Sequence, residues 1–295
     1  MGRNYLAKLN LDDTEIIGYS VGGEETVIAV PVLDICFDIG KSPEEVLSVN
    51  NVLLSHGHMD HAAGIAYYCS QRNFREMAPG TVIVPPSLAP VLEDLLDCWG
   101  RLDGCRPPAN IIPVKPGQEY EIRRNLFALP FATNHCRDSL GFTIIERRQK
   151  LKKQYLDLPG QEIARLRKNG EPVTYTLNLP LITYLGDTMG GDFENLACVR
   201  QSRVLIAECT FFDADHRERA RAGRHYHFDQ LAQMLLQTQC EHIILTHLSR
   251  RTDIRMARQM VDKVLPDDLA RRVQFLVQRP RRKFYPQNGP GQQTR

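Results

Sequence analysis

The chain alternates short apolar runs of strand length with segments whose apolar residues recur at helical spacing. The apolar runs predict strands over 15–21, 26–32, 33–38, 51–54, 81–84, 111–114, 120–122, 126–131, 142–145, 181–185, 204–208, 243–246 and 273–277. Helical spacing predicts helices over 61–75, 88–98, 228–239 and 253–264. Pro86 and Gly100 flank the second of these helices as start and stop signals. Strands and helices mixed in this order indicate an α/β or α+β fold.

A dense group of polar side chains follows the fourth of these apolar runs. It contains His56, His58, Asp60 and His61. In an extended segment His56 and His58 point to the same side, while Asp60 and His61 can close around a second point. Imidazole and carboxylate are ligands of zinc or a similar borderline metal, so the spacing predicts a site for two ions. The alternative interpretation is a solvated histidine-rich loop that binds nothing.

More candidate ligands stand at the ends of later apolar runs. These are His135, Asp187, His225, His227 and His247. Gly186 precedes the aspartate and allows the backbone to turn tightly there. Loops that leave successive strands carry the chemistry in α/β proteins, so we expect these side chains to meet at one rim of a sheet.

Seven of these residues, in their order along the chain, resemble the ligand pattern of the metallo-β-lactamase superfamily: His56, His58, Asp60, His61, His135, Asp187 and His247. Within it the chain resembles the tRNase Z (ribonuclease Z) branch, endonucleases that trim the 3′ end of precursor tRNA. Further matches to that branch are Glu-Cys-Thr-Phe at 208–211, His-Tyr-His at 225–227, His-Leu-Ser-Arg-Arg at 247–251, and 150–155 with 158–163, which resemble the arm of the short forms. The likeness runs from about residue 15 to 278. It departs at Thr252, where the branch has a tyrosine, and this puts substrate positioning in doubt rather than the chemistry.

The resemblance implies a fold, which is an αββα sandwich of two sheets with helices on both outer faces. Residues 1–284 would form this single domain. An arm at about 147–178 would be inserted between the third metal histidine and the bridging aspartate. Residues 285–295 are polar and rich in glycine, proline and glutamine, and we expect a flexible tail.

The resemblance also assigns roles in cleavage by a metal-bound hydroxide. Two divalent ions, most readily zinc, would be held by two sets of three ligands with one bridging carboxylate: His56, His58 and His135; Asp60, His61 and His247; and Asp187 between them. Asp60 would also orient or deprotonate the attacking water. His225, oriented by Glu208, would give a proton to the leaving 3′-oxygen, with His227 as the rival for this role.

Positive charge is concentrated in the block that would form the arm. The residues expected to bind tRNA are Arg147, Arg148, Lys150, Lys152, Lys153, Arg165, Arg167 and Lys168, against only Asp157 and Glu162. Such a block neutralises phosphates and gives salt-sensitive affinity that is independent of sequence. The alternative is a solvated hairpin whose lysines add only solubility. A second basic cluster at 279–283 has the same ambiguity.

The amino-acid composition adds little to these predictions of fold and function. A hydrophobic content of 42%, a charged content of 24% and a net charge of +2 are ordinary for a globular enzyme. We expect a cytoplasmic protein that does not span a membrane, with free cysteines, and by the resemblance a homodimer. A thiolate ligand from Cys136 or Cys209 stays open beside the histidines and aspartates. Two other function classes also stay open, a small-substrate hydrolase of the same fold and a catalytically silent RNA-binding subunit.

Overall fold

The computed structural model describes residues 6–277 and contains two sheets of seven strands each. The first sheet consists of β1 (Ala7–Leu11), β2 (Thr14–Val21), β3 (Glu25–Val30), β4 (Ile35–Ile39), β5 (Asn51–Leu53), β6 (Gly80–Val84) and β7 (Ala109–Pro113) in that order. The second sheet consists of β8 (Tyr120–Arg123), β9 (Leu126–Ala132), β10 (Leu140–Leu151), β11 (Thr174–Tyr184), β12 (Val204–Glu208), β13 (His242–Thr246) and β14 (Val273–Phe275) in that order. Each sheet is thus built from one continuous half of the chain.

Each sheet begins with antiparallel hairpins and continues with parallel strands. The strands from β4 to β7 pair in parallel in the first sheet, and those from β11 to β14 do so in the second. Parallel strands end at the same edge of a sheet, which is where the connecting loops can gather functional side chains. This topology gives the sandwich two distinct rims, one at the carboxyl ends of the parallel strands and one at their amino ends.

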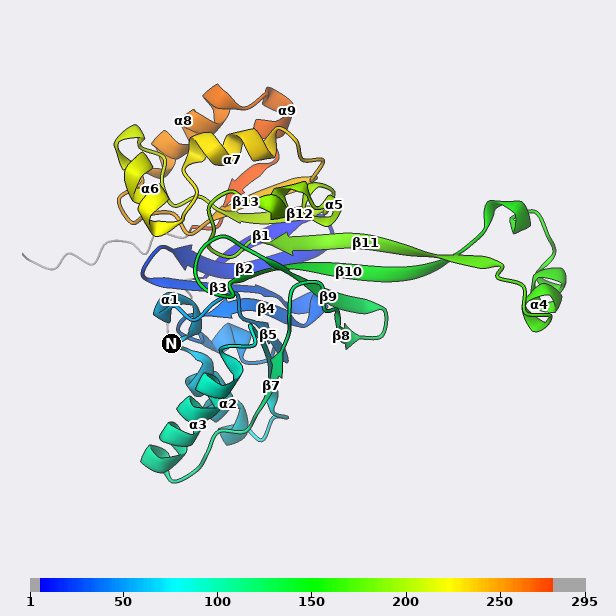
Figure 1. The fold of residues 1–295 in the computed structure, drawn as a ribbon, viewed down its shortest axis with the longest axis horizontal. Coiled ribbons are helices and arrows are strands. Elements are labelled where there is room, and N and C mark those ends of the chain that lie inside the picture. The colour runs from blue at the N-terminus through cyan, green and yellow to red at the C-terminus, as the bar shows by residue number, and fades with distance from the viewer. Residues whose placement is uncertain (1–5, 278–295) are drawn as a thin grey trace, which may run out of the picture.

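Helices cover the outer face of both sheets (Figure 1). The helices of the described residues are α1 (Met59–Ala62), α2 (Ile65–Phe74), α3 (Ala89–Asp103), α4 (Gly160–Lys168), α5 (Ala197–Arg200), α6 (Arg217–Gly223), α7 (Phe228–Leu235), α8 (Ile254–Val264) and α9 (Asp267–Ala270), and α4 alone lies away from the sandwich. One buried cluster lies between the sheets, where residues such as Phe37 and Phe142 meet. A second joins α2 and α3 to the first sheet, and a third joins α7, α8 and α9 to the second. The predicted αββα sandwich is confirmed.

Several elements differ from what the apolar pattern predicted: β10 and β11 extend well beyond the predicted 142–145 and 181–185, and α5, α6 and α9 were not predicted. Strand β1 was not predicted, because its alternation of Lys8 and Asn10 with apolar residues is short. The helix predicted over 61–75 is divided into α1 and α2 near Gly64, where a Cβ would meet the Ile39 carbonyl oxygen at 2.5 Å. The prediction that Gly100 ends its helix was wrong, because α3 continues to Asp103 and ends at Gly104, whose φ of 77° closes the helix.

Strands β10 and β11 extend as a two-stranded ribbon well beyond the sandwich (Figure 1). Their pairing continues from Phe142–Tyr184 inside the sheet to Leu151–Thr174 at the far end. The connection between them contains a short turn at Lys153–Tyr155 and then α4. This ribbon and its helical tip lie between His135 and Asp187 in the sequence, and we call residues 147–178 the arm. The predicted tail at 285–295 and the basic cluster at 279–283 lie outside the described residues.

Candidate metal centre and adjoining acid–base pair

The predicted ligands gather at the rim formed by the carboxyl ends of the parallel strands. His56 and His58 lie between the end of β5 and helix α1, Asp60 and His61 lie in α1 itself, and Asp187 follows β11. His135 comes from the loop between β9 and β10, and His247 follows β13 directly. All seven predicted ligands therefore reach one location, although they come from both sheets.

Four of these residues form a first group whose ligand atoms lie within 4.8 Å of one another: His56, His58, His135 and Asp187. His135 Nε2 is 3.2 Å from His58 Nδ1. The Nε2 atoms of His56 and His135 are each 3.9 Å from Asp187 Oδ2. Distances of this size leave room for one cation between the nitrogens and the carboxylate oxygen.

Asp60, His61 and His247 form a second group of the same kind. Asp60 Oδ2 is 3.7 Å from His61 Nε2 and 3.4 Å from His247 Nε2. Asp187 Oδ2 also faces this group, at 3.3 Å from His61 Nε2 and 3.2 Å from His247 Nε2. The Asp187 carboxylate thus lies between the two groups, in the position that the sequence predicted for a bridging ligand.

Two buried nitrogens show that the groups suit cations. The Nε2 atoms of His56 and His61 are buried and have no hydrogen-bond partner among the described residues. A buried polar atom without a partner is costly, and an imidazole nitrogen that faces a carboxylate can bind a metal ion once it carries no proton. The donor set of imidazoles and carboxylates fits divalent ions of the borderline class.

The electrostatics of the groups agree with this interpretation. Burial lowers the pKa of His56 well below its usual value, so its ring is neutral. Burial also acts on His61, but the Asp187 and Asp38 carboxylates raise the pKa of that ring well above its usual value. Burial opposes ionisation of Asp187 too, yet the neighbouring imidazoles, led by His247, hold its pKa well below the usual range. Asp187 is therefore an anion that needs a positive partner, and a divalent ion can replace the proton on His61.

Asp38 is a buried residue that orients the candidate ligands, and the sequence did not predict this role. Its carboxylate is fully buried and accepts bonds at 2.7 Å from His61 Nδ1, from the Ser55 amide and from the Ser55 hydroxyl, and at 2.6 Å from the Tyr184 hydroxyl. The Ser55 hydroxyl lies 2.9 Å from His56 Nδ1. These contacts fix which ring nitrogens face the centre. The available clue was one aspartate inside the apolar run that forms β4.

Backbone turns place the two ligands from the second sheet. Gly186 has a φ of 64°, and a Cβ there would lie 2.9 Å from the Ser55 Cβ, so the tight turn predicted at this glycine is confirmed. His247 itself has a φ of 54°, which is strained for a residue with a side chain. Its amide donates to the Ser20 hydroxyl at 2.9 Å, and its Nδ1 lies 2.9 Å from the Thr210 hydroxyl. These bonds hold the strained residue in place.

Glu208 and His225 form a pair beside the two groups. His225 Nδ1 donates to Glu208 Oε1 at 2.8 Å, and the same nitrogen is 4.0 Å from Asp187 Oδ2. Glu208 is buried and also accepts from the amides of Thr188 and Thr210. Burial lowers the pKa of His225, but the bond to Glu208 outweighs it and raises that pKa above the usual value.

His227 has a different environment from His225. Its Nδ1 accepts from the Asp229 amide at 3.2 Å, and its Nε2 donates to the Asp213 carbonyl oxygen at 2.9 Å. It therefore caps the amino end of α7 with both ring nitrogens engaged. Of the two candidates that the sequence left open, only His225 contacts Glu208 and Asp187.

The cysteines lie apart from the ligand groups. All eight are free, and the groups of candidate ligands found in residues 6–277 contain none of them. Burial raises the pKa of both Cys136 and Cys209, which keeps their thiols protonated. The arrangement gives no support to the alternative of a thiolate ligand.

Comparisons with known proteins agree with this geometry. The sequence model of the β-lactamase superfamily domain matches residues 37–248. A chloroplastic tRNase Z of Arabidopsis thaliana is 34% identical over 260 residues, which cover 87% of this chain and 73% of the relative. A second tRNase Z of the same plant is 34% identical over 274 residues, covering 92% and 97%. The chain belongs to the tRNase Z branch of the β-lactamase superfamily.

Solved structures share the fold of this tRNase Z branch at low sequence identity. The short form of human tRNase Z superposes with a TM-score of 0.56 at 17% identity, covering 79% of this chain and 92% of the human one. A metallo-β-lactamase fold protein of Bacillus subtilis gives a TM-score of 0.60 at 15% identity, with coverages of 84% and 90%. These likenesses show the fold and carry no residue roles.

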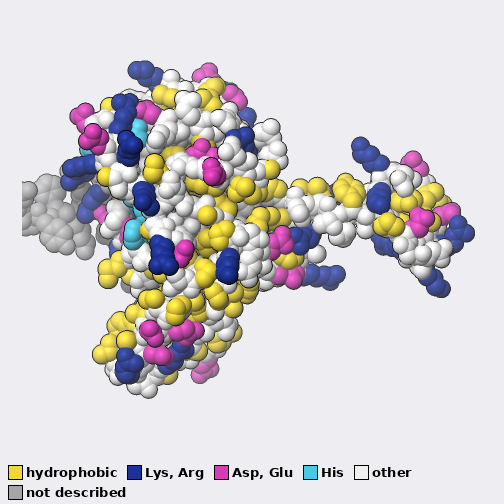
Figure 2. All heavy atoms as spheres, viewed as in Figure 1, with side chains coloured by type: hydrophobic (Ala, Val, Ile, Leu, Met, Phe, Trp, Pro, Cys, Tyr) yellow, Lys and Arg dark blue, Asp and Glu magenta, His cyan; other side chains and the backbone are white. Residues whose placement is uncertain are grey.

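The basic residues of the arm fall into two kinds. At its root, Arg147 pairs with Glu119 at 2.7 Å and its guanidinium lies 4.1 Å from the centroid of the Phe127 ring, while Arg148 pairs with Glu146 at 2.6 Å. At the tip, Arg165 pairs with Glu162. The remaining predicted residues have no carboxylate partner in the described part of the chain: Lys150, Lys152, Lys153, Arg167 and Lys168. Figure 2 shows blue side chains around the tip, far from the sandwich.

The described residues contain no helix that could span a membrane. None of their helices has both the length and the apolar character that crossing a bilayer requires.

Asp38→Asn tests the orienting role of Asp38. The amide keeps the shape but loses the negative charge that holds His61 Nδ1–H, so we expect metal affinity to fall by roughly 10–100-fold. Competition with a fluorescent chelator measures this. The exposed Asp94→Asn on α3 removes the same charge elsewhere and should leave affinity unchanged. Equal metal affinities of the two variants would remove the orienting role.

Proposed function

We propose that this chain is a metal-dependent endoribonuclease that cleaves the phosphodiester at the 3′ end of precursor tRNA. The observation that carries this proposal is the Glu208–His225 pair, whose histidine lies 4.0 Å from the central Asp187 carboxylate. A hydrolase acting on small substrates has no need of the arm, which projects a group of unpaired lysines away from the site. The relatives that are 34% identical are named tRNase Z, which supports the same substrate.

The proposed ligand sets are those that the sequence predicted. His56, His58 and His135 would hold one ion, Asp60, His61 and His247 would hold the other, and Asp187 would be a ligand shared by both. Zinc is the metal we propose, because imidazole and carboxylate in a compact group are typical zinc ligands. When bound, two divalent ions supply an activated water at neutral pH and stabilise the negative charge of the phosphodiester.

The protein's own acid–base groups handle the protons. His225 donates through Nδ1 to Glu208, so its Nε2 is the atom that can give a proton to the leaving 3′-oxygen. The Glu208 carboxylate raises the pKa of His225 above its usual value, which favours the protonated ring that a general acid requires. Asp60 accepts the Gly23 amide at Oδ2, at 2.8 Å, which holds its carboxylate toward the centre, where it orients the attacking water.

We also propose that two copies of this chain form a homodimer through α3. This helix buries Leu92 and Leu96 against the first sheet, yet it exposes a second apolar stripe at helical spacing: Val91, Leu95, Trp99 and Leu102. Tyr67 and Phe74 of α2 extend the stripe, and Figure 2 shows hydrophobic side chains over this lobe. An exposed apolar patch of this kind is typical of an interface. The cytoplasmic location stays a prediction.

The direct test of the proposed function is incubation of the purified protein with a 3′-extended precursor tRNA. We expect cleavage at one position near the end of the acceptor stem, abolished by a chelator and restored by added Zn²⁺ or another divalent ion. Mapping of the product ends measures it. Cleavage that survives thorough chelation, or degradation at scattered positions, would contradict the proposal.

Substitution of His225 separates chemistry from binding. We expect His225→Ala to lower the single-turnover cleavage rate by about 10²-fold or more, because the leaving oxygen loses its acid, with little change in affinity for precursor tRNA. His227→Ala is the matched control, since it removes an imidazole two residues away that only caps α7. A normal rate for His225→Ala beside a slow His227→Ala would exchange the two roles.

The arm can be tested with a triple substitution of Lys150, Lys152 and Lys153 to Ala. We expect affinity for precursor tRNA to fall by roughly an order of magnitude, and its salt dependence to become shallower by about 0.7–0.9 for each lost phosphate contact. Hydrolysis of a small chromogenic phosphodiester should be unchanged, because that substrate cannot reach the arm.

Removal of three positive charges from α8 and α9 is the control for the arm variant. Arg255, Lys263 and Arg271 are exposed and belong to neither the centre nor the arm. Their replacement by Ala should leave tRNA affinity nearly unaltered at moderate salt. Equal losses in both variants would show that only overall charge matters, and no loss in either would favour the small-substrate hydrolase.

The dimer proposal predicts a change of mass on substitution of the α3 stripe. Leu95→Asp with Trp99→Asp places charges on the apolar face, and we expect light scattering to report a monomer where the unmodified protein is a dimer. Trp99 is the sole tryptophan, so its fluorescence in the unmodified protein should also shift on dilution. A monomeric unmodified protein, or a variant that stays dimeric, would contradict the proposal.

A further inference from the structure

A cavity of about 350 Å³ opens at the rim opposite the candidate metal centre. Its walls include Leu33, which precedes β4, and Arg203, which precedes β12, so it lies at the amino ends of the parallel strands. The metal centre lies at their carboxyl ends, and the buried cluster between the sheets separates the two. The cavity therefore takes no part in the chemistry proposed above.

The walls of the cavity are partly aliphatic, and the aliphatic residues come from both sheets. They are formed by Val32, Leu33, Leu126, Leu181 and Ile182. The first two belong to the segment that leads into β4, and the other three to β9 and β11 of the second sheet. The space between these aliphatic side chains, which we call the slot, favours an apolar ligand body, and the volume of the cavity is that of small-molecule sites.

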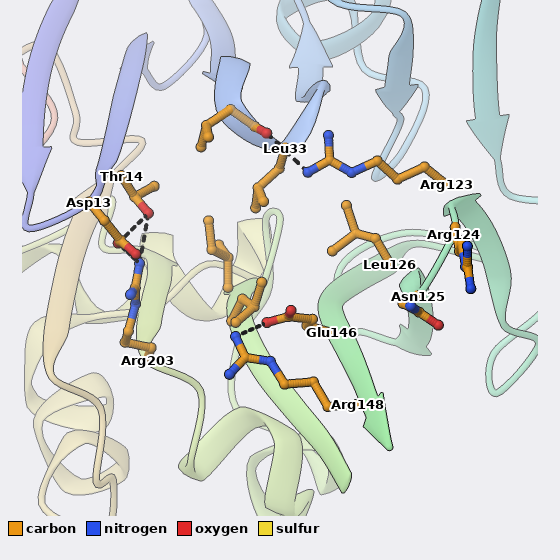
Figure 3. A pocket seen from close by; sticks show the side chains of 13 residues that line it. Asp13, Thr14, Leu33, Arg123, Arg124, Asn125, Leu126, Glu146, Arg148 and Arg203 are labelled. Atoms are coloured by element: carbon orange, nitrogen blue, oxygen red, sulfur yellow. Dashed lines mark hydrogen bonds and ion pairs between the residues drawn. The ribbon is translucent and has the colours of Figure 1, made fainter. Parts of the chain in front are cut away.

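Four arginines surround this slot: Arg123, Arg124, Arg148 and Arg203. Figure 3 shows Arg123, Arg148 and Arg203 arriving from three different elements around the opening. The only carboxylates in the wall are Asp13 and Glu146. Asp13 is paired with Arg203, and Glu146 with Arg148. Arg123 and Arg124 have no carboxylate partner in residues 6–277, which leaves the cavity with two uncompensated positive charges.

Arg123 and Arg203 are held in place before any ligand arrives. Arg123 donates to the Val32 carbonyl oxygen at 3.1 Å, which spans the two sheets. Arg203 likewise crosses to the first sheet, donating to the Thr14 hydroxyl at 2.7 Å, and its buried Nε has no acceptor in the described chain. The turn that carries Arg124 is fixed by Asn125, whose φ is 66° and whose carbonyl oxygen accepts the Arg147 amide at 2.8 Å. Such preorganisation lowers the entropy cost of binding.

We propose that this cavity binds a small organic phosphate with a flat apolar body, of the size of a mononucleotide. Guanidinium groups bind phosphate through paired N–H donors, and Arg123 and Arg124 have such donors to spare. The aliphatic slot takes the flat body, and the planes of the surrounding guanidiniums can stack on it. The ligand would bridge the first sheet and the β8–β9 turn, close to the root of the arm.

Adenosine 5′-monophosphate serves as the probe, titrated by calorimetry into the metal-loaded protein. We expect saturable binding of one molecule per chain at submillimolar concentration. Adenosine, which lacks the phosphate, and inorganic phosphate, which lacks the flat body, should each bind at least tenfold more weakly. Hydrogen exchange should slow at 123–126 and near Arg203 when the nucleotide binds, and not at 56–61. Protection confined to 56–61, or no saturable binding, would overturn the proposal.

The test variant combines Arg123→Ala with Arg124→Ala. Its charge-matched control combines Arg255→Ala on α8 with Arg271→Ala, which directly follows α9. We expect the first pair to weaken nucleotide binding at least tenfold and the control to leave it unchanged, with precursor tRNA cleavage normal in both. Arg124→Ala alone guards against misfolding, because Arg124 makes no described side-chain contact, and it should also weaken binding measurably.

Two results with these variants would overturn the proposal. One is equal nucleotide affinity in the Arg123/Arg124 variant and the unmodified protein, which would place the nucleotide at the metal centre. The other is a loss of precursor tRNA affinity in the Arg123/Arg124 variant together with no nucleotide binding by the unmodified protein. This result would make the cavity part of an RNA-binding path. Because cleavage is measured separately, failure of the proposed function does not affect this test.

Discussion

The negative charge of the buried Asp187 carboxylate must be balanced by positive charge, and the rest of the site depends on this constraint. Its Oδ2 lies within 4 Å of the imidazole nitrogens of His56, His61, His135 and His247, and the side chain is only 3% exposed. Without a cation, a proton on His61 is the available balance, and the buried Nε2 of His56 is left without a hydrogen-bond partner. Two divalent ions satisfy the carboxylate and the nitrogens together, which explains why so many ionisable groups are kept in one place.

The topology of the two sheets brings together the residues that can balance this charge. Parallel strands in both sheets end at one rim, so ligands from residues as distant as His56 and His247 meet without long loops. The opposite rim is then free to carry other chemistry, such as the arginine-lined cavity. Between them, the inter-sheet core fixes both rims relative to each other. The β10–β11 ribbon leaves this body sideways, so the arm can contact a large substrate while the centre acts on one phosphodiester (Figure 1).

The sequence predicted much of the site because its signals are local. The histidines and aspartates stand directly after apolar runs, and the ends of parallel strands must share an edge. Asp38 was missed because its role is created by contacts with Ser55, His61 and Tyr184, the last of which comes from the other sheet. The cavity could not be predicted for the same reason: Arg148 and Arg203 lie far from Arg123 and Arg124 in the sequence, and the fold brings them together. Helix ends were harder still, since Gly100 continues a helix whose packing outweighs its low propensity.

Metal content measured by elemental analysis tests the central claim most directly. Protein purified without chelator and then equilibrated with Zn²⁺ should hold two ions per chain after gel filtration. Asp187→Ala should lose at least one of them, because each ion shares that carboxylate. A reproducible content of zero or one in the unmodified protein would contradict the account, since the Asp187 carboxylate and the orphaned nitrogens of His56 and His61 would then require another balance.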